Sequence, residues 1–333
     1  MVFHKDILQI DCKAEADRIS AFIRRQVSGQ RREGAVVGIS GGVDSALAAT
    51  LCTRALGKDR VLGLILPEKE SNPVSAEYAS RCAAQLGVDA ITIDITSALD
   101  IMGTYRKRDE VIKDIFPEYN AQYKSKITLP PDLLSRDALN FFSLKIEDGR
   151  GNVKSARLGI RGLRTIVAAT NIKQRTRTIY LYNYAEMKNY LVCGTTNRSE
   201  NIQGFFVKYG DGGVDIEPLA HLYKMQVYQL SGYLGVSREI MEREPTPDTY
   251  SFNQSDEEFY FRMPYDILDL LLYAWENRIP IAEVCQAMSL TEEQVKRAFR
   301  DFTAKANATN HLRSMPPTLE SLSGNDDVQT ENM

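Results

Sequence analysis

A short apolar segment that ends in the turn SGGVDS constrains the fold of this chain most strongly. Residues 35–39 (AVVGI) have the composition of a buried strand, and the helix-forming stretch ALAATLCTRAL follows the turn directly. Gly41 and Gly42 let the backbone bend tightly and approach a ligand, because neither carries a Cβ atom. The N–H groups at the start of the helix then point toward that ligand, at the positive end of the helix dipole. This strand, turn and helix therefore predict a phosphate-binding site.

The polar residues of the turn add to this prediction. Ser40 and Ser45 can contribute hydroxyl donors. Asp44 is unexpected there, because a carboxylate repels a phosphate unless a cation lies between them, so we expect Mg²⁺ to bridge Asp44 and phosphate oxygens. The turn lacks the lysine of a Walker A loop and the spacing of a GxGxxG dinucleotide fingerprint. The structural alternative is a tight turn whose Ser and Asp only cap the helix.

Strand-like and helical segments alternate around this unit. Further apolar strand-like segments occur at 61–66, 90–95 and 190–193. Helical patterns occur at 11–27, 75–86, 163–185, 224–234, 255–276, 281–288 and 292–306. The alternation predicts an α/β fold, in which helices cover both faces of a doubly wound parallel sheet, and the last four patterns predict a helical C-terminal part.

The region of about 101–159 interrupts the alternation. It contains charge clusters, Pro130 and Pro131, the turn EDGRG and scattered aromatic residues. We interpret it as an insertion of short helices and loops, because so long a connection in an α/β domain is usually functional or mobile. Residues 317–333 are polar and poor in aromatic residues, which is typical of a disordered tail. The sequence therefore predicts one domain over residues 1–316, with an insertion and a tail.

Composition excludes several classes of protein. The 333 residues include 41 Lys and Arg and 44 Asp and Glu, a net charge of −3, so we expect no general affinity for nucleic acid. The five cysteines form no CxxC pair, and neither a disulfide framework nor a zinc site is predicted. The sequence has no 18-residue apolar run and no signal-peptide pattern, which predicts a cytoplasmic protein outside the membrane.

A second polar constellation lies between Gly194 and Lys224. GTTNRSE directly follows the strand-like segment 190–193, and KYGDGG comes further along. Loops at the carboxyl ends of parallel strands gather round a ligand, so Glu200 can supply a second carboxylate to a metal ion held by Asp44. Glu200 can equally cap the next helix. KYGDGG suits close approach to a polar ligand or, alternatively, a simple β-turn.

With these two constellations, the sequence resembles the NAD synthase family, within the larger group of PP-loop ATP pyrophosphatases. The resemblance rests on residues 38–45, GTTNRSE, GFFVKYGDGGVDIEPL and EPTPD, in the family's order. It implies an adenine nucleotide alpha hydrolase-like fold and one reaction. Such enzymes attach AMP from ATP to the nicotinate carboxylate of deamido-NAD (nicotinic acid adenine dinucleotide), release pyrophosphate, and let ammonia displace AMP to give NAD.

The resemblance also implies roles for individual residues. Asp44 and Glu200 would be Mg²⁺ ligands, and Asp44 and Lys224 would be catalytic. The residues implied in ATP binding are Gly38, Ile39, Ser40, Gly41, Gly42, Val43, Asp44, Ser45, Thr195, Lys224 and Thr246. Those implied in binding deamido-NAD are Arg175, Lys208, Asp215 and His311. The family also implies a homodimer.

Two segments depart from the family pattern. Leu312 stands where the family commonly has lysine, and Arg313 beside it can replace the charge. FYFRMPYD, after QSDE, stands where the family usually has an acidic, glycine-containing stretch. These departures keep open an alternative, a PP-loop amide ligase that adenylates a different carboxylate.

The source of nitrogen and two other classes of protein complete the expectations. Glutamine-dependent relatives carry an amidase domain before the synthase core, whereas SGGVDS begins here at Ser40, so we expect free ammonia or ammonia from a separate partner. A PP-loop enzyme that modifies tRNA would need a basic surface and often paired catalytic cysteines, which this sequence lacks. A nucleotide-binding regulator would not require Asp44, Glu200 and Lys224 together.

Overall fold

A four-stranded parallel sheet with the strand order β3-β2-β1-β7 forms the centre of the computed structural model, which describes residues 3–135 and 141–319. Its strands are β1 (Gly34–Gly38), β2 (Val61–Ile65), β3 (Asp89–Thr92) and β7 (Tyr190–Cys193). Because β1 pairs with both β2 and β7, the turn after β1 leaves the sheet at the middle of its carboxyl edge. The predicted parallel α/β fold is confirmed. Of the predicted tail, residues 320–333 lie outside the described residues.

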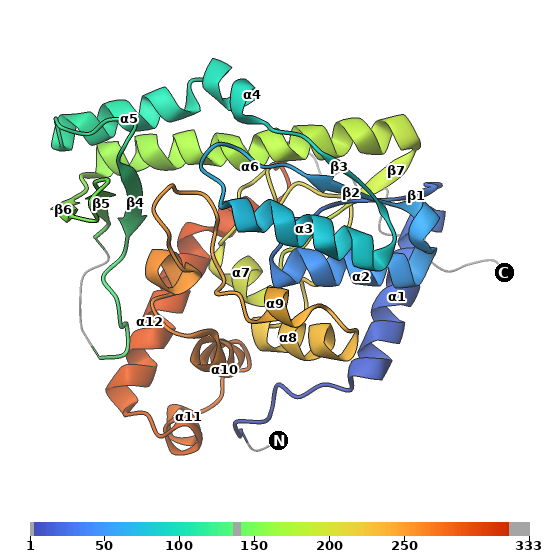
Figure 1. Cartoon of the computed structure of the whole chain (residues 1–333). Coiled ribbons are helices and arrows are strands. Elements are labelled where there is room, and N and C mark those ends of the chain that lie inside the picture. Colours follow the sequence, from blue (N-terminus) through green and yellow to red (C-terminus); the bar gives the residue numbers. More distant parts are fainter. Residues whose placement is uncertain (1–2, 136–140, 320–333) are drawn as a thin grey trace.

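Helices cover both faces of this sheet, because successive side chains of β1 point to opposite sides. Ala35 and Val37 belong to one core, which contains buried residues of α1 (Cys12–Gly29), α2 (Val43–Leu56), α3 (Pro73–Leu86) and α8 (Lys224–Tyr233). Val36 belongs to a second core with α4 (Thr96–Ile101), α5 (Thr104–Ile115) and α6 (Ile160–Lys188). Figure 1 shows α5 and α6 on one side of the sheet and α1, α2 and α3 on the other.

The C-terminal part is helical, as predicted, and has a core of its own. Its longer helices are α10 (Tyr265–Glu276), α11 (Ile281–Met288) and α12 (Glu292–Ala308), joined by the short α13 (Asn310–Arg313). Leu272, Val295 and Phe302 are buried there together with Phe3 from the start of the chain. Short helical turns connect the layers: η1 (Lys58–Arg60), α7 (Arg198–Gln203), α9 (Arg238–Met241) and the π-helical turn η2 (Glu257–Phe261).

The prediction of one helix over 255–276 was wrong. The π-helical turn η2 ends at Arg262, whose φ angle of 64° lies in the left-handed region, and α10 begins only after Pro264. Proline restricts the residue before it and has no N–H to donate, so a continuous helix cannot pass through this position without losing a hydrogen bond.

The interpretation of 101–159 as short helices and loops was also incomplete. Besides α4 and α5, this segment forms an antiparallel sheet of β4 (Lys124–Thr128), β5 (Ser143–Glu147) and β6 (Val153–Arg157). In β5, Leu144 and Ile146 are buried and alternate with more exposed polar residues. That period of two was present in SLKIE, and the EDGRG turn after it, where Asp148 accepts hydrogen bonds from the N–H groups of Arg150 and Asn152, marks the hairpin.

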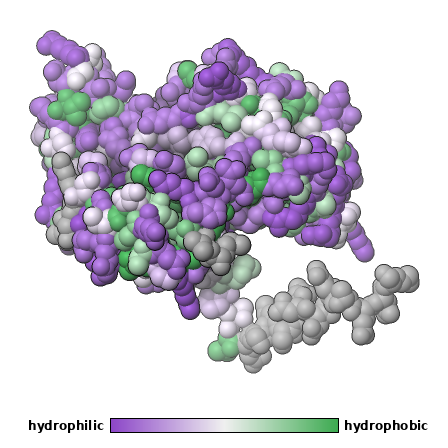
Figure 2. All heavy atoms as spheres, turned by 90° about the horizontal axis from the view of Figure 1, so that it is seen from below, coloured by the Kyte–Doolittle hydropathy of each residue, from purple (hydrophilic) through white to green (hydrophobic). Residues whose placement is uncertain are grey.

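The outer surface is largely polar. Figure 2 shows a face that is mostly hydrophilic, with hydrophobic residues in small patches between polar ones. Within residues 3–135 and 141–319, none of the helices combines the length and the apolar character needed to cross a membrane.

A buried ion cluster ties the long helix α6 to the rest of the fold. Lys173 is 0% exposed, and its Nζ lies 2.7 Å from Glu68 Oε1, 2.8 Å from Glu70 Oε2 and 2.7 Å from the carbonyl oxygen of Thr249. Arg108 of α5 donates to the same oxygen of Glu70 at 2.5 Å. Burial raises the pKa of Glu70, but Lys173 and Arg108 outweigh it and lower that pKa overall. The cluster joins α5, α6, the β2–α3 loop and the loop that contains Thr249.

We predict that Lys173→Met lowers the free energy of unfolding by about 3–5 kcal/mol at neutral pH, because it leaves buried carboxylates without their ammonium partner. The loss is measured by urea denaturation. Since Lys173 lowers the pKa of Glu70, its contribution exists above the unfolded pKa and shrinks as the pH falls below about 4. Arg164→Met, at an exposed position on the same helix, is the control and should change stability by less than about 0.5 kcal/mol. Equal stabilities of the two variants would contradict the prediction.

Candidate active site

Hydrogen bonds of its own hydroxyl groups fix the conformation of the turn after β1. Gly41 has a φ of +78°, and a Cβ atom there would lie 2.3 Å from the carbonyl oxygen of Ser75. Ser45 Oγ donates to the carbonyl oxygen of Gly42 at 3.0 Å and accepts from the N–H of Ser40 at 3.1 Å. Among the described side chains, none forms a cap hydrogen bond at Gly42, where α2 begins. The first N–H groups of α2 therefore face the solvent side of the turn, which favours the anion site over simple capping.

Two cavities meet at this turn. The larger, of about 590 Å³, extends from the turn toward α6, the 204–211 loop and the 244–250 loop. The smaller, of about 210 Å³, lies between the carboxyl ends of β1, β2 and β7 and is lined by Gly38, Ile39, Leu64–Leu66 and Gly194. Ser40, Ser45 and Thr195 line both cavities. Gln174, Asp211, Pro247 and Asp248 line both cavities as well, so a ligand that occupied both would pass between these residues and the turn.

Asp44 and Lys224 meet at the edge of the larger cavity. Asp44 lies in the first turn of α2 and Lys224 in the first turn of α8, and Lys224 Nζ is 2.5 Å from Asp44 Oδ2. Asn197 Nδ2 donates to the other oxygen, Asp44 Oδ1, at 3.0 Å. Lys224 is only 3% exposed, and burial would lower its pKa, but Asp44 and then Glu200 outweigh burial and raise that pKa. Lys224 is therefore held as a cation.

Glu200 caps a helix, which is one of the two roles considered from the sequence, and its position at the cavity is compatible with the other. It forms a capping box with Asn197 at the start of α7, in which Asn197 N–H donates to Glu200 Oε2 at 3.2 Å. It also lines the larger cavity with Asp44 and Lys224. Burial raises the pKa of Glu200 well above its usual range, and the negative charge of Asp44 raises it further.

Asp256 is a further carboxylate at this site, and the sequence reasoning assigned it no role. It is 4% exposed and lines the larger cavity. Tyr265 Oη donates to Asp256 Oδ2 at 2.9 Å, whereas Oδ1 is buried with no hydrogen-bond partner among the described residues. Burial raises the pKa of Asp256 to about 6, despite the nearby charge of Lys224. The sequence offered one signal for a role of Asp256, which is its place in QSDE shortly before the atypical stretch FYFR.

The charges at this site fit a divalent cation. Three carboxylates, those of Asp44, Glu200 and Asp256, influence the charge of a single lysine, Lys224, and the pKa values of Glu200 and Asp256 are raised. Carboxylate oxygens are the ligands that Mg²⁺ prefers, and it commonly takes one or two of them together with phosphate oxygens. Over residues 3–135 and 141–319, no group of three or more His, Cys, Asp or Glu side chains is arranged as a metal site. The chemistry of the carboxylates, and not an arrangement of three of them around one point, is what fits the cation.

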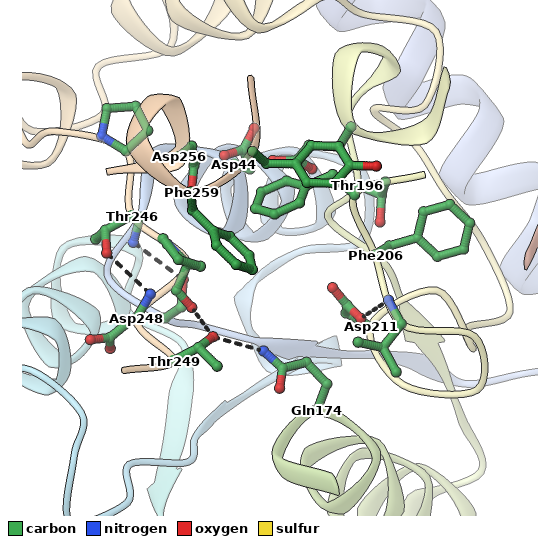
Figure 3. A pocket seen from close by; sticks show the side chains of 18 of the residues that line it. Asp44, Gln174, Thr196, Phe206, Asp211, Thr246, Asp248, Thr249, Asp256 and Phe259 are labelled. Atoms are coloured by element: carbon green, nitrogen blue, oxygen red, sulfur yellow. Dashed lines mark hydrogen bonds between the residues drawn. The ribbon is translucent and has the colours of Figure 1, made fainter. Parts of the chain in front are cut away.

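The loop 244–250 closes the cavity opposite Phe206 and Asp211, and Figure 3 shows Asp44 and Asp256 on a third side. Thr246, which the resemblance implies in ATP binding, lines this cavity. Asp248 holds the loop against α3, since it accepts from Ser75 Oγ at 2.9 Å and from the N–H of Asn72 at 3.0 Å. Burial in the cavity wall raises the pKa of Asp211 to about 6.

The four residues implied in binding deamido-NAD take different positions. Arg175 and Lys208 line the larger cavity, and Arg175 Nε donates to the carbonyl oxygen of Lys208 at 3.3 Å. Lys208 Nζ donates to the carbonyl oxygen of His311 at 2.7 Å, which ties the C-terminal turn to the cavity. Neither Asp215 nor the His311 side chain is among the residues that line the two cavities. Asp215 instead accepts from the N–H of Val192 at 2.7 Å.

The C-terminal departure from the family pattern also has a structural outcome. Leu312 lines the larger cavity. Arg313, expected to replace the missing charge, donates to the carbonyl oxygens of Asn201 at 2.9 Å and Ala306 at 2.7 Å. Its guanidinium therefore joins α7 to α12 in this structure.

An apolar wall of the larger cavity was not predicted. It combines Ile127 and Phe142 of the 101–159 segment, Leu163 and Val167 of α6, Tyr250 of the 244–250 loop and Phe259 of the atypical stretch after QSDE. Phe205, from the 204–211 loop, stacks on Tyr260 with ring centroids 5.0 Å apart. The aromatic residues of both segments were visible in the sequence, but nothing in the sequence showed that the two segments meet.

The sequence model of the NAD synthase family matches residues 15–128 and 138–316. The chain belongs to this family. It is 47% identical to the NH3-dependent NAD+ synthetase of Mesorhizobium japonicum over 93% of this chain and 97% of the relative. It is 44% identical to the enzyme of the same name from Rhizobium meliloti, over 96% of each chain.

Solved structures of the NAD synthase fold are also similar. The NH3-dependent NAD synthetase of Campylobacter jejuni, solved with nitrate, has a TM-score of 0.62 and 24% identity over 94% of this chain and 100% of that one. The NMN synthetase of Francisella tularensis has a TM-score of 0.63 and 23% identity over 93% of this chain and 99% of that one. At these identities the two structures bear on the fold alone.

We predict that Gly41→Ala weakens ATP binding by at least about tenfold, because the turn must shift away from Ser75 and lose hydrogen bonds to phosphate. Isothermal titration calorimetry measures this affinity. Gly57→Ala is a matched control, since Gly57 also has a positive φ, +83°, but no atom within 4 Å of a Cβ there. The control should lose about 1–3 kcal/mol of stability from backbone strain, since Gly57 combines its positive φ with a ψ of 153°, and should keep its affinity for ATP. An unchanged ATP affinity in Gly41→Ala would exclude the turn as the phosphate site.

Proposed function

We propose that this chain is an NH3-dependent NAD+ synthetase, which activates the carboxylate of deamido-NAD with ATP and amidates it with ammonia. The observation that carries the proposal is the identity of 47% and 44% to two enzymes of that name over more than nine-tenths of each chain. The two cavities together, called the cleft below, support the proposal. The SGGVDS turn, the buried Lys224 and a group of carboxylates line the larger of them.

Each step of this reaction makes a definite demand on the protein. In the first step, a carboxylate oxygen of the substrate attacks the α-phosphorus of ATP, an O–P bond forms, and the bond to the pyrophosphate oxygen breaks. In the second, the nitrogen of ammonia bonds to the acyl carbon, the C–O bond to AMP breaks so that AMP leaves with that oxygen, and the nitrogen releases one proton. The first step brings two anions together, so positive groups must neutralise charge before they meet.

The residues of the cleft can meet that demand. The N–H groups at the start of α2 would bind ATP phosphates, with Ser40 and Ser45 completing the turn. Lys224 would neutralise phosphate charge and cannot serve as a base, since Asp44 and Glu200 raise its pKa. Asn197 would keep Asp44 oriented toward the turn. Asp44 and Glu200 would hold Mg²⁺, which supplies positive charge to the phosphates when it is bound.

The two cavities suggest how the substrates divide the cleft. The smaller cavity, at the carboxyl ends of the strands, suits the adenosine of ATP. The larger cavity has the size of a site for a substantial ligand and offers Arg175 and Lys208 for its phosphates. Its apolar wall, with Phe142 and Phe259, suits the flat face of a pyridine ring.

We also propose the homodimer that the resemblance implies. Ile179 and Met187 of α6 are 64% and 73% exposed, although they are large and apolar. They lie on the helix that also contains Arg175. A second copy of the chain packed along α6 would cover both residues.

We predict that purified protein with ATP, Mg²⁺ and deamido-NAD forms NAD, AMP and pyrophosphate in equal amounts when ammonium is present. Glutamine should not replace ammonium. Chromatography of the nucleotides and a pyrophosphate assay follow the three products. AMP formation with some other carboxylic acid, and none with deamido-NAD, would favour the alternative of an amide ligase with a different acyl substrate.

We predict that Asp44→Asn slows pyrophosphate release by at least about a hundredfold and weakens Mn²⁺ binding to the ATP complex by at least about tenfold, because the side chain keeps its shape but loses its charge. Electron paramagnetic resonance of Mn²⁺ measures the second effect independently of turnover. Asp17→Asn, which removes an exposed carboxylate that pairs with Lys13 and Arg54, is the control and should alter neither. Full activity in Asp44→Asn would refute the role of Asp44.

A further inference from the structure

Two segments that are more than 100 residues apart in sequence run side by side next to the cleft. Residues 124–133 contain β4 and its extension, and residues 250–262 contain the π-helical turn η2. The bonds between them are Ser125 N–H to Ser251 Oγ (3.0 Å), Phe252 N–H to Ser125 O (3.3 Å), Gln254 Nε2 to Ile127 O (2.5 Å), Leu129 N–H to Glu258 O (3.4 Å) and Leu133 N–H to Arg262 O (3.1 Å). The 101–159 segment therefore holds 250–262 along its whole length.

Lys126 lies at the centre of this contact. It is only 7% exposed, and its Nζ donates to the carbonyl oxygen of Asn253 at 2.9 Å and to Glu258 Oε2 at 2.7 Å. The ammonium also lies 4.1 Å from the centre of the Phe252 ring. Lys145 of β5 donates to the second oxygen of Glu258 at 3.2 Å. Charge-assisted hydrogen bonds of this kind are stronger than neutral ones, and few alternatives exist for a buried ammonium.

Lys126 binds Asn253 and Glu258, and residues between these two reach the active site. Asp256 lies between Asn253 and Glu258 in sequence, and its carboxylate lines the larger cavity. Its N–H donates to the carbonyl oxygen of Pro245 at 3.0 Å, so Asp256 also fixes the neighbour of Thr246. Phe259, one residue after Glu258, forms part of the apolar wall. A change in the position of 253–258 would therefore displace groups on two sides of the cavity.

We propose that Lys126 is a positioning residue for the amidation reaction, which holds the 253–258 segment so that Asp256 and Thr246 keep their places at the cleft. Lys126 acts through the segment, because Lys126 itself does not line either cavity. The role gives the β4–β6 sheet a function in the reaction. The proposal rests on the proposed function for its kinetic test, but its structural test is independent of the substrate.

Lys126→Met tests the role while it keeps most of the buried alkyl chain. We expect kcat/KM for ATP to fall by about tenfold or more, which corresponds to the loss of one charge-assisted hydrogen bond. KM for ATP should rise, because Thr246 is implied in ATP binding and would move. At the same time kcat should fall, because Asp256 lies in the same cavity as Asp44 and Lys224 and would move as well. Hydrogen–deuterium exchange should become faster in peptides from 250–262 and stay unchanged in peptides from β1 and β2.

Matched variants separate this role from general stability. Lys124→Met removes an exposed ammonium of the same strand, 3.6 Å from Glu147, and should leave both readouts as in the wild type. Glu258→Gln should reproduce the effect of Lys126→Met in part, and the double variant should be less impaired than the product of the single effects, since both changes remove one interaction. If Lys126→Met does not fold, Glu258→Gln, at a partly exposed position, provides the test.

The outcomes distinguish the two proposals. A wild-type protein that does not amidate deamido-NAD refutes the proposed function, and exchange in 250–262 then still tests the contact. A wild-type protein that is active, with Lys126→Met equal to it in kcat, KM and local exchange, overturns the role of Lys126. Faster exchange throughout the variant, with kcat and KM unchanged in the folded fraction, overturns it as well, because it indicates a purely structural residue.

Discussion

The excess of negative charge around Lys224 is the constraint on which the site depends. Asp44 contacts this lysine directly, and the charges of Glu200 and Asp256 also act on it. Burial and mutual repulsion raise the pKa values of Glu200 and Asp256, while the same carboxylates keep Lys224 protonated. This balance of charge suits phosphates that are bound together with a cation, which is the arrangement proposed above for ATP and Mg²⁺. The chemistry of an ATP-dependent ligase and the electrostatics of the cleft therefore agree without reference to any relative.

The rest of the fold keeps that lysine in place against the cost of burial. Ser199 Oγ in α7 accepts from the N–H of Lys224 at 3.2 Å and donates to Asp269 Oδ1 at 2.6 Å. Asp269, in α10, also accepts from the N–H of Met225 at 2.7 Å, at the first turn of α8. The C-terminal helices thus determine where α8 begins, and the beginning of α8 determines where the ammonium of Lys224 lies. The helical part is in this sense a support for the phosphate site.

Local patterns in the sequence predicted the parallel sheet and the turn, because both depend on short-range periodicity. The alternation of Ala35, Val36 and Val37 between two cores and the turn at SGGVDS are both visible in adjacent residues. Asp256 and the buried Lys173 escaped prediction for the opposite reason, since an isolated Asp or Lys resembles a surface charge until its distant partners are known. Glu68, Glu70 and Thr249 surround Lys173 from more than 70 residues away. Long-range charge pairs leave no periodic trace in a single sequence.

Strand β4 of the antiparallel sheet within residues 101–159 contacts the active-site region with both of its faces. Successive side chains of β4 point in opposite directions, so Ile127 can line the cavity while the adjacent Lys126 holds the 253–258 segment. A flexible loop would lose conformational entropy when it placed both side chains, and this loss would oppose their positioning. A strand that is already paired with β5 presents them in a fixed register. The apolar wall and the placement of Asp256 are consequently two results of one structural element, and a change in β4 should affect both together.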